Sequence, residues 1–349
     1  MPANKSQHFV PRCYLRAFCA DSTGAAINVF NMARERSIEA APARGQCAKP
    51  YFYGSDGVLE NALQQPEGAY AANMRRAVDD PRALSRDDLR TLHAFMLLQS
   101  YRSAAWLKGE IRMAEAQRDL LAAEATPELL EGLVITHEMA IEMALYAFRN
   151  SIDTTSHLET CILLNRTPLS FITSDDPVIY TNRFHLQKDV LGGGGLASPG
   201  CMLVMPLTPH MLLLSFDPAI YSPGGRAAEP VVIDRVSDVV AYNELQAIKG
   251  NANLYFKDWN DRVLVEAAYQ AAKHRRRDMW YDVETLQETA PGSGTFVAVT
   301  EGYVHDPDRR ELLHTARNIP APADWPTTLS YTVRARRAKR GVDQSDLWD

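Results

Sequence analysis

Strand-like and helix-like patterns of hydrophobic residues occupy separate blocks of the chain. Residues 25–32 place β-branched and aromatic side chains at alternating positions, which predicts a strand. A Thr-Pro-His sequence just before residue 211 is typical of a tight turn between antiparallel strands. Further strands are predicted at residues 157–165, 170–173, 177–182, 201–207 and 211–217.

Residues 58–152 have the apolar spacing of helices, and we expect three helices there. Pro66 removes a backbone hydrogen bond inside the first, which predicts a kinked helix or two short ones. Ser85 is a favourable N-cap for the second, which we expect to run to about residue 117. Thr126, followed by proline, starts the third by the same logic. Two later helices are predicted at residues 231–250 and 257–277.

Strands before and after a helical block predict an α+β fold, in which an antiparallel sheet carries an inserted helical subdomain. The chain of 349 residues is too long for one minimal core and short for three domains. We expect residues 1–280 to form the main domain. We expect residues 281–349 to form a C-terminal extension, with a strand at 294–304 followed by a basic tail.

The composition is that of an ordinary globular protein, with 46% hydrophobic and 23% charged residues. A formal net charge of −6 argues against a generally basic nucleic-acid binder, although a local basic groove remains compatible with it. Basic clusters occupy residues 273–277 and 334–340. Solvated surface is their simpler interpretation, and a phosphate-binding patch for nucleic acid is the alternative.

The cysteines and the apolar runs bear on the cellular setting. The five cysteines contain no CxxC pair, so we expect reduced and mostly buried thiols rather than a zinc ribbon or a disulfide framework. No run approaches the ~18 apolar residues that cross a bilayer. The N-terminal residues lack the apolar stretch of a secretory signal. We therefore expect a cytoplasmic protein without a membrane partner.

Arg102 lies on an otherwise apolar helix face, where an unpaired charge is costly. We therefore expect a carboxylate partner. Glu60 and Glu67, seven residues apart on the preceding helix, are the nearest candidates in the sequence. Gln99 is three residues before Arg102, so the two side chains are neighbours on the helix.

The stretch FITSDDPV places two adjacent aspartates after a short apolar strand. Neighbouring side chains of extended chain point to opposite sides, and Pro177 favours an extended Asp176. We expect one aspartate to face the core or a cleft, and the other to face solvent or cap the turn. Ser174 is able to bond the same turn, and a purely structural turn is the simpler interpretation of this motif.

Several segments, in order between residues 7 and 256, resemble motifs of the family known as domain of unknown function 4238 (DUF4238). They are HFVPRCYLRAF, VLENALQQPEGAYA, LLQSYRS, FITSDDPV, VMPLTPHMLLL and YNELQAIKGNANLYF. The resemblance implies no established reaction. Its motif pattern admits asparagine at the second aspartate, which favours Asp175 over Asp176 as an acid or base. The positions it nominates are His8, Tyr14, Glu60, Glu67, Gln99, Arg102, Ser174, Asp175, Asp176 and Asn243.

Our first functional hypothesis is a metal-dependent hydrolase or nuclease that acts on a phosphoryl-containing substrate. Glu60, Glu67 and Asp175 would hold Mg²⁺ or Mn²⁺, which prefer oxygen ligands. His8 would be the general acid or base, and Arg102 would stabilise the anionic substrate. The residues expected to contact the substrate are Tyr14, Gln99, Ser174, Asp176 and Asn243.

The alternative hypothesis is a non-catalytic binding module. The same polar residues would then form a buried ion-pair network that joins the helical block to the sheet, with Arg102 between the glutamates. A cleft open to water over these residues favours the enzyme, whereas burial with mutual saturation favours the module.

Overall fold

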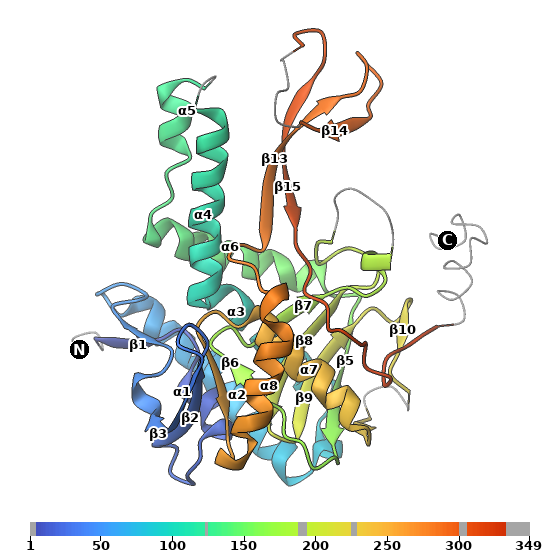
Figure 1. The fold of residues 1–349 in the computed structure, drawn as a ribbon. Coiled ribbons are helices and arrows are strands. Elements are labelled where there is room, and N and C mark those ends of the chain that lie inside the picture. Colours follow the sequence, from blue (N-terminus) through green and yellow to red (C-terminus); the bar gives the residue numbers. More distant parts are fainter. Residues whose placement is uncertain (1–4, 123–124, 188–193, 225–228, 300–305, 333–349) are drawn as a thin grey trace.

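The computed structural model describes residues 5–122, 125–187, 194–224, 229–299 and 306–332. Two sheets form the body of the molecule (Figure 1), and the predicted α+β fold is confirmed. The strands of the five-stranded sheet, in spatial order, are β11 (Val231–Ile233), β5 (Glu159–Asn165), β9 (Met211–Phe216), β8 (Met202–Thr208) and β7 (Ile179–Thr181). Its pairings are antiparallel except that of β11 with β5.

The second large sheet is antiparallel throughout and contains the strand that leads into the two aspartates. Its strands, in spatial order, are β3 (Arg36–Pro42), β2 (Ala26–Asn31), β12 (Asn253–Phe256) and β6 (Thr173–Ser174). Three smaller sheets join β1 (Ser6–His8) with β4 (Ala48–Pro50), β10 (Tyr221–Ser222) with β16 (Ser330–Tyr331), and β13 (Tyr281–Glu288) with β14 (Phe296–Ala298) and β15 (Glu311–Arg317).

The helical block between β4 and β5 divides more finely than expected. The helix predicted to run from Ser85 to about residue 117 ends at Arg102, because Ser103 is extended (ψ 149°) and caps the next helix through the amide of Trp106. Pro66, by contrast, lies inside one continuous helix. The helices of the block are α2 (Val58–Asp79), α3 (Arg86–Arg102), α4 (Ala104–Leu121), α5 (Pro127–Gly132) and α6 (His137–Thr154).

Three further helices lie outside the block: α1 (Arg12–Leu15), α7 (Val236–Lys249) and α8 (Arg262–Ala272). The helix expected at 231–250 therefore starts later, because residues 231–233 pair with β5 as a strand. The helix expected at 257–277 is shorter at both ends.

The five-stranded sheet is buried on both faces. Along β8, Leu203 and Met205 belong to the core shared with the helical block, whereas Met202 and Val204 belong to the core on the opposite face. The period of two residues is that of any strand. Helix α7 covers the second face and lies in front of the sheet in Figure 1.

The C-terminal extension adds a projecting β-structure. In Figure 1 the β13–β15 sheet rises from the body beside α4 and α5, and β13 contacts α4. Of the strand predicted at 294–304, β14 covers residues 296–298, and residues 300–305 are outside the described range. The basic tail at 334–340 also lies outside the described residues.

Ser85→Ala should lower the free energy of unfolding by about 1 kcal/mol. Ser85 Oγ accepts from the Asp88 amide (3.2 Å), and the Asp88 carboxylate accepts in return from the Ser85 amide (2.9 Å). The substitution removes the first of these bonds at the start of α3. Urea unfolding, with the exposed Ser55→Ala as control, measures the effect. Equal stabilities of the two variants would show that the cap contributes nothing.

Candidate functional site

Arg102 is the centre of a buried network that ties the N-terminal strand to the helical block. Its Nε donates to the Tyr53 hydroxyl (3.0 Å), and its Nη2 donates both to Glu67 Oε1 (2.8 Å) and to the His8 carbonyl (2.9 Å). Only 4% of Arg102 is exposed. The predicted pairing with a glutamate of the preceding helix is therefore confirmed, with Glu67 as the partner.

The neighbours of Arg102 are held by the same network. Gln99, one turn earlier on α3, donates to the Phe9 carbonyl (2.9 Å), so α3 binds the backbone of residues 8 and 9 through two side chains. Burial raises the pKa of Tyr53, and the negative charges of Glu67 and Glu60 raise it further against the opposing effect of Arg102. Glu60 in the first turn of α2 therefore lies within electrostatic reach of this network.

The His8 side chain is half-buried and contacts a backbone carbonyl. Its Nε2 lies 3.2 Å from the Arg44 carbonyl, and burial lowers the pKa of the imidazole below its ordinary value. A ring nitrogen that donates to a carbonyl fixes the tautomer of a neutral imidazole. The predicted role of general acid or base stays a prediction.

Asp175 and Asp176 are both buried, at 5% and 2% exposure. Asp175 accepts hydrogen bonds from the backbone amides of Asn251 (2.9 Å) and Ala252 (3.0 and 3.1 Å), and Asp176 forms an ion pair with Lys249. The expectation that one of them faces solvent or merely caps the turn was wrong. The last residue of α7 pairs with Asp176, and the chain just after α7 supplies the amides that bind Asp175.

Side chains of α7 hold the strand that precedes the aspartates. Asn243 accepts from the Ile172 amide (3.0 Å) and donates to the Ser170 carbonyl (2.8 Å). Ser174 Oγ donates to Gln246 (2.8 Å). These contacts position β6 and the SDDP stretch against the helix.

Tyr14 joins the two large sheets from inside the core. Its hydroxyl lies 2.6 Å from the Thr173 hydroxyl on β6 and donates to the Pro206 carbonyl on β8 (2.7 Å). Burial raises the pKa of the phenol well above its ordinary value. The nominated residues thus fall mainly into two networks, one around Arg102 and one around the aspartates, and most of their hydrogen bonds go to other residues of the chain. Arg102 Nη1 and Gln99 Oε1 are buried without a hydrogen-bond partner in the described structure.

The structure offers no ready ligand set for the predicted divalent metal. Within the described ranges, no three His, Cys, Asp or Glu side chains gather in a way that would hold a metal ion. Glu67 is occupied by Arg102, and Asp175 by backbone amides. The metal site of Glu60, Glu67 and Asp175 stays a prediction that the geometry does not favour.

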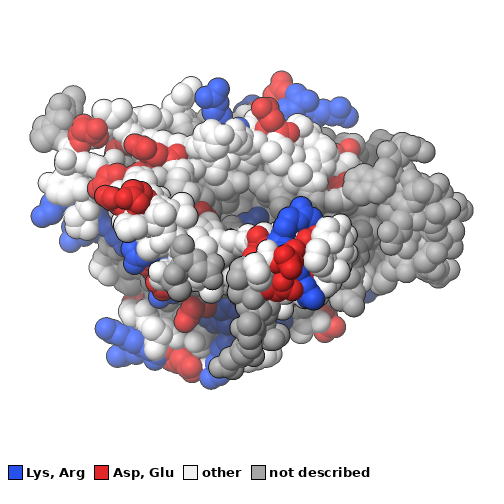
Figure 2. Space-filling model, turned by 90° about the horizontal axis from the view of Figure 1, so that it is seen from above, with Lys and Arg blue, Asp and Glu red and all other residues white. Residues whose placement is uncertain are grey.

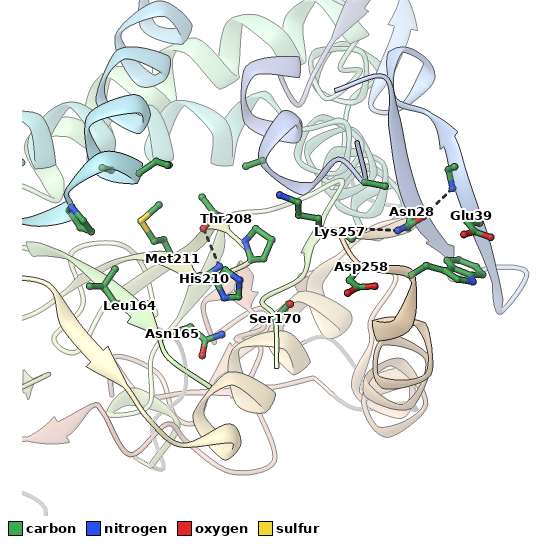
Figure 3. A pocket seen from close by; sticks show the side chains of 18 residues that line it. Asn28, Glu39, Leu164, Asn165, Ser170, Thr208, His210, Met211, Lys257 and Asp258 are labelled. Atoms are coloured by element: carbon green, nitrogen blue, oxygen red, sulfur yellow. Dashed lines mark hydrogen bonds between the residues drawn. The ribbon is translucent and has the colours of Figure 1, made fainter. Parts of the chain in front are cut away.

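A larger cavity lies away from the nominated residues. Figure 3 shows this space of about 890 Å³, with Asn165, Ser170 and His210 on one side and Lys257 and Asp258 across from them. None of the nominated residues lines it. The buried amides at its walls are already bonded to the protein: Asn28 to the Lys257 carbonyl and the Ala40 amide, Asn165 to the Leu169 carbonyl and to Thr167.

A smaller pocket of about 190 Å³ is strongly cationic. It lies where α4, the end of α7, the start of β13 and the end of β15 meet. Among the described residues that line it, Asp278 is the one acid. The basic side chains of its walls are Lys108, Arg112, Lys249, Arg276, Arg277 and Arg317.

Some of these cations already have partners. Lys249 pairs with Asp176, and Arg276 donates to carbonyls at and after the end of α7. Arg277 lies 3.8 Å from Asp282 in an exposed pair. Lys249, Arg276 and Arg277 therefore already bind partners within the protein.

Lys108, Arg112 and Arg317 have no carboxylate within 4.0 Å in the part of the chain that the structure describes. Arg317 is held over the ring of Tyr180, 4.3 Å from its centroid, a favourable cation–π arrangement. Glu110 on α4 interacts electrostatically with Arg317, but burial raises the pKa of that carboxyl, which disfavours its charge.

A buried donor without a partner also lines the pocket. Asn318 Nδ2 is buried and has no hydrogen-bond partner within the described structure. Buried polar groups normally have partners, so an unused donor beside unpaired cations marks a place where an acceptor fits. The sequence signal for this pocket was the basic run at 273–277, for which solvated surface was the simpler interpretation and a phosphate-binding patch the alternative; the basic residues of α4 gave no separate signal.

The two aspartates form the support behind this pocket. Asp176 anchors Lys249, and Asp175 holds the backbone of Asn251, and both of these partners line the pocket. The SDDP stretch therefore shapes one wall without lining the pocket itself.

These features define an α+β protein with two buried polar networks and a cationic pocket beside them. A family model described as "Protein of unknown function (DUF4238)" matches residues 6–260, and the chain belongs to this family. The resemblance expected for residues 7–256 is thereby confirmed. Comparisons with curated proteins and with solved structures find no match.

Two further expectations concern the cysteines and membrane-spanning helices. All five cysteines are free thiols, four of them buried and Cys13 partly so, as predicted. None of the described helices combines the length and the apolar character needed to span a membrane.

Proposed function

We propose that this protein is a binding module that captures a ligand by its phosphoryl group in the cationic pocket. The observation that carries the proposal is the convergence of Lys108, Arg112 and Arg317 without carboxylate partners. The unused amide donor of Asn318 lines the same pocket.

Charge and hydrogen-bonding capacity favour a phosphoryl group. Like charges held together in a partly enclosed pocket repel one another, and a bound anion removes that cost. A phosphate monoester carries about −1.5 to −2 charges at pH 7 and three acceptor oxygens, enough for two guanidinium groups, one ammonium and one amide. A guanidinium is also the group best shaped for bidentate contact with phosphate.

The two buried networks support the binding module over the metal-dependent hydrolase or nuclease. Arg102, Glu67, Asp175 and Asp176 are committed to protein partners, so their role is to hold the helical block, β6 and the end of α7 in register. Buried polar networks of this kind rigidify a fold, which supports a structural role for these residues.

A compact ligand fits better than a long nucleic acid. Figure 2 shows acidic and basic side chains interspersed over the described part of the face seen from above, without a continuous basic track. Nucleic-acid binding relies on many cations arranged along a backbone. The pocket concentrates its charge at one point instead.

Arg317→Gln should weaken the binding of inorganic pyrophosphate at least about 10-fold, the equivalent of one lost charge-assisted contact of ~1.4 kcal/mol. Isothermal titration of the wild-type chain and the variant measures this directly. The control is Arg90→Gln, because Arg90 lies on the exposed face of α3 and pairs only with the equally exposed Asp87. Equal affinity in the wild type and in Arg317→Gln, or no affinity in either, would contradict the proposal.

A further inference from the structure

Gly109 occupies a position in α4 where the protein itself does not require glycine. It lies inside the helix Ala104–Leu121 and lines the cationic pocket. A Cβ added there would meet no protein atom within 4 Å. Glycine in a helix interior is less favourable than alanine, so this residue weakens α4 without any packing reason in return. What it does provide is an open stretch of helix backbone in the pocket wall.

The face of α4 that carries Gly109 is well defined. Ala105, Lys108, Gly109 and Arg112 follow the i, i+3, i+4, i+7 spacing of one helix face, and all four line the pocket. The small residues Ala105 and Gly109 form one row along this face, and the basic residues Lys108 and Arg112 form the row beside it. The result is a flat surface with positive charge along one edge.

Aromatic side chains complete the walls around this surface. Trp106 comes from α4, Tyr281 is the first residue of β13, and Trp280 comes just before it. Lys249 Nζ lies 5.5 Å from the centre of the Trp280 ring, and the Arg317 guanidinium lies 5.8 Å from that of Tyr281. Aromatic rings beside basic groups are the combination that binds a planar ring joined to an anion.

The volume of the pocket limits how much of such a ligand it encloses. Its volume is about 190 Å³. Pockets that enclose a whole drug-sized ligand begin near ~300 Å³. A phosphoryl group and its linkage fit inside, so the rest of the ligand must lie at the mouth, against Gly109 and the aromatic side chains.

We infer, building on the function proposed above, that the ligand is a phosphate monoester of a planar ring compound, of the mononucleotide class. Its phosphoryl group lies among Lys108, Arg112 and Arg317. Its ring lies on the α4 backbone at Gly109, beside Trp106 and Trp280.

Four probes separate the contributions of ring and phosphate: adenosine 5′-monophosphate, ribose 5-phosphate, inorganic phosphate and adenosine. Isothermal titration of the full chain should find the monophosphate about 10-fold tighter than ribose 5-phosphate, the effect of stacking one base. Adenosine, which lacks the charge, should bind most weakly. Equal affinities for adenosine 5′-monophosphate and inorganic phosphate would overturn the inference about the ring but leave the phosphoryl-binding function intact. No binding of any phosphate-containing probe would overturn both.

Gly109→Ala tests the same site, because we expect it to stabilise the protein and at the same time to weaken nucleotide binding. The added methyl group should raise Tm by about 1 °C, because alanine favours the helix. It should also weaken adenosine 5′-monophosphate binding at least about 5-fold while leaving inorganic phosphate unchanged. Gly68→Ala in α2, where a Cβ also meets nothing, is the matched control that should stabilise without any effect on binding. Unchanged nucleotide affinity in Gly109→Ala would overturn the placement of the ring.

Discussion

Arg102→Ala should lower the free energy of unfolding by about 3 kcal/mol, the usual result of removing one partner of a buried ion pair. The substitution leaves Glu67, the Tyr53 hydroxyl and the His8 carbonyl without their shared donor. It also detaches the N-terminal strand from α3. Urea unfolding followed by circular dichroism measures the loss, and the 28% exposure of Glu67 keeps it from being larger.

The matched comparison is Arg90→Ala on the opposite, solvent side of the same helix. Arg90 pairs with Asp87 at 2.9 Å, but 79% of the arginine side chain is exposed. Exposed pairs contribute about 0–1 kcal/mol, so this variant should stay close to the wild type. Similar losses of the free energy of unfolding in both variants would show that the buried contacts of Arg102 stabilise the protein no more than an exposed ion pair does.

Asp175→Asn should remove a pH dependence worth about 2 kcal/mol between pH 4 and pH 7. Burial raises the pKa of the Asp175 carboxyl from 3.8 to about 6, and the negative charge of Asp176 adds to the rise. The amides of Ala252 and Asn251 oppose it without cancelling it.

The direction of this effect follows from proton binding. Below pH 4 the carboxyl is protonated in both states and carries no penalty. Between pH 4 and 6 the folded state holds the proton more tightly than the unfolded state, so stability falls as the pH rises through that window. Above pH 6 the full cost of a buried charge is present.

Asparagine does not titrate, so the difference in stability between wild type and Asp175→Asn isolates this carboxyl. The wild type should lose stability relative to the variant as the pH rises from 4 to 7. A change in the other direction would mean that the three amide contacts outweigh burial. If the variant fails to fold, the infrared band of a protonated buried carboxyl in the wild type near pH 5 gives the same answer.

Local sequence patterns were sufficient for the elements that depend on local physics. Alternating residues located β2, the Thr-Pro-His turn indicated the β8–β9 hairpin, and the N-cap Ser85 located the start of α3. The cost of an unpaired charge on an apolar face was enough to predict a glutamate partner for Arg102. Each of these inferences needs only residues close in sequence or on the neighbouring helix.

Two of the failures depend on contacts between distant segments, and one depends on a single local residue. The burial of Asp176 requires Lys249, which lies 73 residues later in the chain. The apolar pattern continues across Ser103 without interruption. The only local sign of the break between α3 and α4 is Ser103 itself, which caps the start of α4. The cationic pocket combines residues from α4, the end of α7, β13 and β15, and in the sequence they resemble four unrelated surface segments.

The cationic pocket crosses the boundary of the family-matching segment. Residues 6–260 supply Lys108, Gly109 and Arg112, together with the wall held by the aspartates, whereas Trp280, Tyr281 and Arg317 come after that segment. The Arg102 and Asp175 networks lie within it completely. The pocket therefore needs residues from both sides of residue 260, whereas the two networks do not. Sequence changes after residue 260 that keep the packing of Val265 and Tyr269 against the four-stranded sheet would alter one half of the pocket and leave both buried networks intact.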